Sequence, residues 1–316
     1  MVCAFDIKDA LEKLYRRYNQ REWIGSDPLQ FVYHYSTPAD MEIAGFLASA
    51  LAYGRVQQIK KSLTKLFERM GKSPFEFVAH FDEKKRKTLK DFRHRFTSGE
   101  DISDLFALFR TVLDRYGSIE KCFVSDYHPG DKNIIPALSK FCDRLLSLHA
   151  AKHNEHVGRG LRYLLAGPAG GSACKRLNLF LRWMIRDDCV DTGLWTSIDP
   201  AKLIVPVDVH MGRLCKILGF HHRKTLTLPT AIAITERFTE IEPTDPVKYD
   251  FALSRIGIVE NCNGSYQLQC ESCPLHFLCP PRTMKGRVFR KQDDKTRKRS
   301  AYGRQRENQS VVSLHG

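Results

Sequence analysis

The sequence lacks any uninterrupted apolar run long enough to cross a membrane as a helix. It also lacks a signal peptide's apolar core, because acidic residues interrupt its first nine positions. Hydrophobic residues make up 42% of the 316 positions, which is enough for a sizeable core in one large domain or two modest ones. We therefore expect a cytoplasmic protein with no membrane partner, whose ten cysteines are thiols or metal ligands rather than disulfides.

Strand signals are also scarce, because no segment shows sustained alternation bounded by turn dipeptides. Apolar spacing predicts amphipathic helices instead. One helix begins at Thr37, a good N-cap that is followed by Pro38 at the first helical position, and it runs through Leu51. Other helices are expected over residues 5–21, 55–70, 74–81, 102–115 and 134–149. The sequence therefore predicts an all-α fold.

Acidic residues are outnumbered, with 36 Asp and Glu against 50 Lys and Arg, so the formal net charge is +14. Such an excess favours a polyanionic partner, because Lys and Arg that neutralise phosphates release counterions. Part of the excess lies in the C-terminal segment 283–316, which is basic, polar and weakly apolar. We expect this tail to be disordered and the body of the protein to remain basic.

Two expected helix starts between Gly171 and Gly219 carry groups suited to chemistry. Lys175 lies in the first turn of a helix that follows a glycine-rich turn, and Asp208 lies at the start of another helix after Pro206. An Asp N-cap accepts hydrogen bonds from unpaired backbone N–H groups. An amine and a carboxylate together suit nucleophilic attack on an electrophilic carbon, and both helix starts also offer N–H groups to phosphate.

Four cysteines follow within 18 residues, at Cys262, Cys270, Cys273 and Cys279, in the pattern C-x7-C-x2-C-x5-C. Zinc ribbons usually pair two C-x2-C knuckles that are separated by a dozen or more residues. This loop has one such knuckle and two other spacings, which suits a compact wrap around one [4Fe–4S] cluster. Zinc remains the alternative, because the spacing alone does not decide between the two.

Three features together resemble helix-hairpin-helix DNA glycosylases of the endonuclease III and adenine glycosylase type. They are the glycine turn with Lys175, the later V-D-x-H at Val207–His210, and the four cysteines. The resemblance extends from about Pro38 to Cys279. It is closest to a bacterial branch with the signatures K-R-L-N-L-F-L-R-W-M and D-P-V-K-Y-D-F-A-L, found here from Lys175 and from Asp245.

This resemblance implies a two-part helical architecture with a cleft. A helical barrel would span 37–188, and a second domain would combine 1–36 with 200–282. DNA would lie across the cleft, with the damaged base flipped into it. The resemblance also implies a monomer associated with the nucleoid.

The same resemblance implies a base-excision glycosylase with abasic-site lyase activity on damaged double-stranded DNA. Lys175 would attack the sugar C1′ to form a Schiff base, and Asp208 would assist its deprotonation and stabilise the transition state. The cysteines would hold a [4Fe–4S] cluster. The residues implied to contact DNA are Gly170, Gly171, Ser172, Ala173, Arg176, Leu51 and Tyr53.

Three positions depart from that glycosylase pattern and leave alternatives open. Leu51 stands where the pattern has a glutamine that fills the gap left by a flipped base, so it is either an apolar wedge or a core residue. Ala173 replaces a hairpin glycine. Trp195, in a long insert over residues 187–205, either stacks on an extruded base or packs the insert onto the body, and we favour packing. A non-catalytic DNA- or RNA-binding protein, or a monofunctional glycosylase using water, are therefore alternatives.

Overall fold

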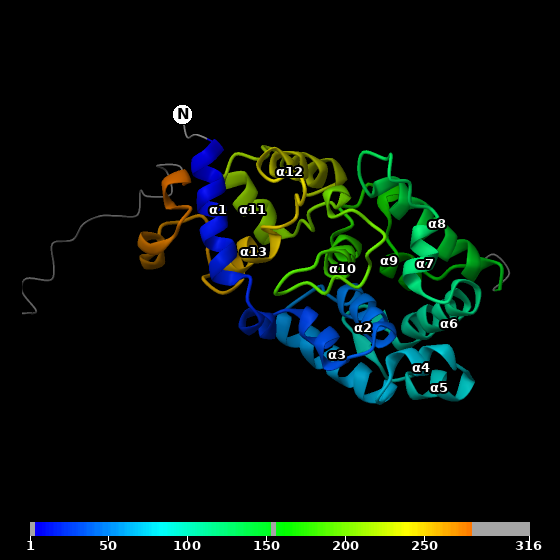
Figure 1. The fold of residues 1–316 in the computed structure, drawn as a ribbon. Coiled ribbons are helices and arrows are strands. Elements are labelled where there is room, and N and C mark those ends of the chain that lie inside the picture. The colour runs from blue at the N-terminus through cyan, green and yellow to red at the C-terminus, as the bar shows by residue number, and fades with distance from the viewer. Residues whose placement is uncertain (1–3, 153–155, 280–316) are drawn as a thin grey trace, which may run out of the picture.

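A computed structural model describes residues 4–152 and 156–279, and Figure 1 shows their arrangement. The described part is mostly helical, as expected from the sequence. It contains no helix with the length and apolar character needed to cross a membrane. The tail predicted to be disordered, 283–316, lies outside the described residues.

The described chain is built from α-helices, short 3-10 helices and one small hairpin. The α-helices are α1 (Ala4–Tyr18), α2 (Pro38–Ala50), α3 (Val56–Met70), α4 (Pro74–Ala79), α5 (Glu83–Thr88), α6 (Gly99–Tyr116), α7 (Ile119–Val124), α8 (Ile135–Ala150), α9 (Arg159–Leu164), α10 (Lys175–Ile185), α11 (Val209–Ile217), α12 (Leu228–Ile241) and α13 (Asp250–Ile258). Short 3-10 helices are η1 (Arg21–Ser26), η2 (Pro28–His34), η3 (Pro168–Gly170), η4 (Pro200–Lys202), η5 (Leu268–Ser272) and η6 (His276–Leu278).

Helix α2 lies at the centre of the core and starts where the sequence predicts. The Thr37 hydroxyl accepts a hydrogen bond from the Asp40 amide, and Pro38 occupies the first turn. Helix α2 packs against α10 and η2. A Cβ at Gly45 would lie 2.8 Å from Met184 Cε, so the absence of a side chain there allows α2 and α10 to approach closely.

Helix α10 lies in the middle of the molecule, between α11 and α13 on one side and the helices α6 to α8 on the other (Figure 1). The N-terminal helix α1 packs against α13, far away in sequence, and α11 also packs against α13. Every residue of α10 from Leu177 to Ile185 is buried. The first turn of α10 is less buried, so the residues there remain available to a site.

The structure differs from the predicted elements at one place that later matters. Residues 93–98 form a small antiparallel hairpin, in which β1 (Arg93–His94) pairs with β2 (Thr97–Ser98). Two-residue strands are too short to show the alternation that predicts a strand.

The insert 187–205 is attached to the body by a buried contact. Trp195 is almost fully buried, and its Nε1 donates a hydrogen bond to Glu42 Oε1 at 3.0 Å. The same carboxylate accepts hydrogen bonds from the amides of Ile119 and Glu120. Trp195 therefore packs the insert onto α2, and its ring does not face an open site where it could stack on an extruded base.

Candidate functional site

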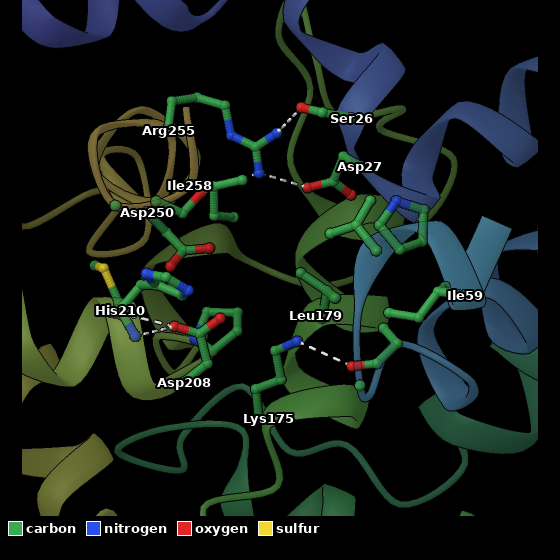
Figure 2. Close-up of a pocket in the computed structure, with 18 of the residues that line it drawn as sticks. Ser26, Asp27, Ile59, Lys175, Leu179, Asp208, His210, Asp250, Arg255 and Ile258 are labelled. Carbon is green, nitrogen blue, oxygen red and sulfur yellow. Dashed lines mark hydrogen bonds and ion pairs between the residues drawn. The ribbon is translucent and has the colours of Figure 1, made fainter. Parts of the chain in front are cut away.

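A cavity of about 480 Å³ opens between the first turn of α10, the start of α11 and the helix α13. Lys175 and Asp208 both line it, although 33 positions separate them in the sequence. Figure 2 shows their side chains around this pocket together with Asp250 and Arg255. The structure thus brings together the amine and the carboxylate that the sequence singled out.

Lys175 is the first residue of α10, and its side chain is only partly buried. Its Nζ donates a hydrogen bond to the carbonyl oxygen of Ala52 at 3.2 Å, a contact drawn in Figure 2. Ala52 also lines the cavity. A single carbonyl partner leaves an ammonium group two further donors. The amine is therefore held at the cavity wall without a carboxylate ion pair among the described residues.

Asp208 is the N-cap of α11, as its sequence context predicts. One of its carboxylate oxygens, Oδ1, accepts hydrogen bonds from the amides of His210 and Met211, both at 2.9 Å. Those bonds fix the carboxylate at the N-terminus of α11 and leave Oδ2 for other contacts. His210 follows on the same cavity wall, and its buried Nδ1 has no hydrogen-bond partner in the described part of the chain.

Asp250 is a cavity residue that the sequence reasoning missed. It lies at the start of α13, is buried, and forms an ion pair with Arg182 at 2.5 Å. Burial raises the pKa of Asp250, Arg182 and more weakly Lys175 lower it, and Asp208 raises it further. Lys175 and Asp208 therefore lie close enough to Asp250 to affect its charge. The only signal in the sequence was an Asp within the signature that starts at Asp245.

Arg182 also lines this cavity. Burial alone would lower the pKa of its guanidinium, but the carboxylates of Asp191 and Asp250 raise it above its usual value. Arg182 lies 3.2 Å from Asp191 in a second ion pair. The wall of the cavity therefore includes a charged arginine that is already ion-paired with two carboxylates.

The predicted glycine turn lies beside a second cavity of about 460 Å³, which Gly170, Gly171, Ser172 and Ala173 line. Gly171 has φ +70°, the left-handed conformation that favours glycine, and a Cβ there would meet open space. Ser172 forms a β-bridge with Thr227, and the Gly171 carbonyl accepts from the Leu228 amide at 3.3 Å. The turn is therefore fastened to the segment before α12, while Gly170 and Gly171 stay exposed.

The other predicted DNA contacts are less accessible. Leu51 is 0% exposed, so it is a core residue, and its side chain presents no surface for a wedge. Arg176 donates to the carbonyl oxygen of Ala50 at 2.8 Å and lies over the Tyr163 ring at 4.1 Å. Burial lowers the pKa of Arg176. Tyr53 is half-buried and bonds through its hydroxyl to Thr97 Oγ1 at 2.6 Å.

The four cysteines lie on one loop that ends the described chain, beside α1 in Figure 1. Burial raises the pKa of Cys279, and the nearby thiols of Cys273, Cys262 and Cys270 raise it further. The four thiols are therefore close enough to influence one another. Over residues 4–152 and 156–279, however, no three His, Cys, Asp or Glu side chains lie within reach of a common metal ion. The donor set of four thiols suits an iron–sulfur cluster or zinc.

Comparison with known proteins corrects the resemblance suggested by the motifs. A family model matches residues 27–259, which ends before Cys262 and so leaves all four cysteines outside the match. No curated protein and no solved structure matches the chain. The matching family is not the helix-hairpin-helix glycosylase superfamily, so the assignment to that superfamily was wrong. The chain belongs instead to the family described as Protein of unknown function (DUF2400).

Proposed function

We propose that this protein excises a damaged base from double-stranded DNA and then nicks the strand, through a Schiff base on Lys175. The observation that carries the proposal is that Lys175 and Asp208, each at the start of a different helix, line one cavity. The arrangement of an amine beside a carboxylate suits attack on the electrophilic C1′ of a deoxyribose. The buried, paired Asp250 gives the same cavity a polar inner wall.

The volume of the cavity suits a small ligand such as a single nucleobase. Its volume of about 480 Å³ falls within the range of roughly 300–1,000 Å³ that is usual for small-molecule sites. Enzymes that act on a base inside a duplex extrude it into such a pocket. The net charge of +14 supports an anionic polymer as the partner.

The proposed reaction proceeds in two steps. First, the Lys175 ammonium group loses a proton to water, and the neutral amine attacks C1′ while the C1′–N glycosidic bond breaks and its electron pair leaves with the base. Asp208 accepts the proton that the newly bonded nitrogen loses and passes it to the departing base, and its carboxylate also stabilises positive charge at the sugar. The lone pair of that nitrogen then breaks the C1′–O4′ bond, O4′ takes up a proton from water, and the iminium forms. Second, water accepts a C2′ proton, the C3′–O bond breaks, and its electron pair leaves with the 3′ phosphate, which becomes the 5′ end of the downstream strand.

A trapping experiment tests the covalent step. Borohydride added to protein and a duplex with an abasic site should reduce the iminium and leave a stable protein–DNA adduct. Lys175→Gln should abolish the adduct while folding and DNA binding persist. Lys202→Gln is a matched control, because Lys202 is also partly buried and also donates to a backbone carbonyl, that of Asp131 at 2.8 Å. A wild-type adduct that survives Lys175→Gln would refute the role of this lysine.

The carboxylate is tested by Asp208→Asn. Asparagine is also a good N-cap, so α11 should remain folded. We expect turnover to fall by a factor of about 10² or more, because the charge that stabilises the transition state is lost. Measured single-turnover rates at saturating protein separate this effect from weaker binding. Unchanged rates would show that Asp208 only caps the helix.

A second candidate function is a non-catalytic DNA- or RNA-binding protein. The hydrogen bond from Lys175 Nζ to the Ala52 carbonyl favours it, because the bond gives the lysine a structural role. If the protein binds damaged or abasic DNA, forms no adduct and releases no base, this reading holds. If it releases a base without an adduct, water activated by Asp208 is the nucleophile and the enzyme is a monofunctional glycosylase.

For the cysteine loop we propose a [4Fe–4S] cluster on Cys262, Cys270, Cys273 and Cys279, with zinc as the alternative. Four thiolates suit either group, and when bound it would cross-link the loop. Anaerobically purified protein should contain iron and acid-labile sulfide, and Cys270→Ser should remove them. The exposed Cys189 provides the control, because Cys189→Ser should leave the metal content unchanged. Stoichiometric zinc without iron would favour the alternative.

A further inference from the structure

The hairpin β1–β2 presents an exposed aromatic side chain. Phe96 at its tip is 57% exposed. Its ring stacks on Tyr53, with centroids 5.0 Å apart and planes at 24°, and meets the Tyr163 ring edge-on at 4.7 Å. One side of Phe96 is therefore fixed against two aromatic rings, while much of the side chain remains open to solvent.

The hairpin is fixed to the cavity wall. The Tyr53 hydroxyl donates to the carbonyl oxygen of His94 at 3.0 Å. His94 Nε2 in turn lies 3.1 Å from the carbonyl oxygen of Tyr53. Ala52, the residue before Tyr53, accepts the hydrogen bond from Lys175. Phe96 is thus linked to the reactive lysine through one short, hydrogen-bonded segment.

Four arginines lie on the hairpin that carries Phe96 and on the helix that carries Tyr163. Arg93 and Arg95 flank Phe96 on the hairpin, and Arg159 and Arg162 lie on α9 beside Tyr163. All four are exposed, and in the described part of the chain none forms an ion pair with a carboxylate. A side chain of Arg95 occupies the space over Gly54, where a Cβ would lie 2.7 Å from its guanidinium.

We propose that Phe96 inserts between bases of the bound duplex and fills the space that the extruded nucleotide leaves. Apolar side chains that enter a base step in this way unstack it, and base–aromatic stacking contributes substantially to binding. The four arginines on the hairpin and α9 would neutralise the adjacent phosphates. This proposal rests on the proposed function, because it takes damaged double-stranded DNA as the ligand. It also replaces the buried Leu51 with an exposed residue as the wedge.

The test uses the full-length protein and a duplex that contains a tetrahydrofuran abasic analogue opposite 2-aminopurine. Wild type should quench 2-aminopurine fluorescence as Phe96 stacks on it. Phe96→Ser should lose the quench and weaken binding about fivefold or more. Phe96→Trp should keep both, since an aromatic face is retained. His80→Ser is the control, because the His80 side chain is a 72% exposed ring that lines neither cavity, and it should behave as wild type.

The outcomes separate this inference from the proposed function. A Phe96→Ser variant that is folded by circular dichroism yet keeps wild-type quench and affinity overturns the inference, and so does a wild type that does not bind the duplex. A Lys175-dependent adduct together with a quench that ignores Phe96 would leave the proposed function intact and refute the wedge. A Phe96-dependent quench without any adduct or base release would support the wedge and refute the proposed catalytic function.

Discussion

Arginines in two regions of the molecule have opposite surroundings. At the C-terminal end of α10, Arg182 and Arg186 are buried and paired, Arg182 with Asp191 and Asp250, and Arg186 with Asp245 at 2.8 Å. Around the Phe96 hairpin and α9, the arginines are exposed and have no carboxylate partner in the part of the chain that the structure describes.

This difference separates charges that hold the fold from charges available to a partner. A buried guanidinium must be paired, because leaving water without compensation is strongly unfavourable. An exposed guanidinium without a partner keeps its hydration and is free to contact phosphate. Net charge alone does not make this distinction, since every arginine, buried or exposed, adds one charge to the total of +14. Removing charges from each region tests the distinction.

The largest effect is expected from Arg182→Met. This change leaves Asp191 and Asp250 buried without their shared cation, which should reduce the free energy of unfolding by about 3–5 kcal/mol. Urea denaturation at neutral pH measures it. Arg237→Met is the control, because Arg237 forms an exposed pair with Glu240 and should lose at most about 1 kcal/mol. Equal losses in both variants would show that the buried arginine contributes no more to the fold than an exposed, paired one.

An intermediate effect is expected from replacing the four exposed arginines of the hairpin and α9, Arg93, Arg95, Arg159 and Arg162, by glutamine. Their loss should reduce the slope of log K against log salt for DNA binding by roughly 0.9 for each phosphate contact removed. The free energy of unfolding should change little, within about 0.5 kcal/mol per site, because surface substitutions away from special features are nearly neutral. A slope identical to that of wild type would show that DNA binds elsewhere.

Local features of the site were predictable from the sequence, whereas the contacts between distant segments were not. Asp208 acts as an N-cap and Gly171 adopts the left-handed conformation, because caps and turns depend on a few adjacent residues. Asp250 was missed because its role depends on Arg182, 68 residues earlier in the chain. The Phe96 hairpin was missed because its strands are only two residues long.

The superfamily resemblance failed for a related reason. A lysine after a glycine turn, a V-D-x-H and four cysteines are short patterns, and each occurs in unrelated chains. The family match covers 27–259 and leaves out the cysteine loop, which had supplied much of the specificity of the resemblance. What survives is the part that the structure supports independently, namely the shared cavity of Lys175 and Asp208.

The smallest expected effect is on the pH dependence of stability, through His94 in strand β1 of the hairpin that carries Phe96. His94 is fully buried, and its Nδ1 lies 2.9 Å from the Ser62 hydroxyl. A neutral ring that donates from Nε2 to the Tyr53 carbonyl and accepts at Nδ1 satisfies both contacts. Burial lowers the pKa of His94 below its ordinary 6.5, and the charge of Arg95 lowers it further.

Because the pKa of His94 is lower in the folded protein, the unfolded chain binds more protons below about pH 6.5. The stability that neutral His94 allows is therefore complete above that pH and declines as the pH falls toward the folded pKa. The slope for this one group should not exceed about 1.4 kcal/mol per pH unit.

Urea unfolding of His94→Gln should show a flatter acid limb than wild type. His80→Gln, which removes an exposed histidine, should keep the wild-type limb. If His94→Gln and wild type decline in parallel, the hairpin does not depend on a neutral His94, and the acid sensitivity lies in the paired carboxylates around α10.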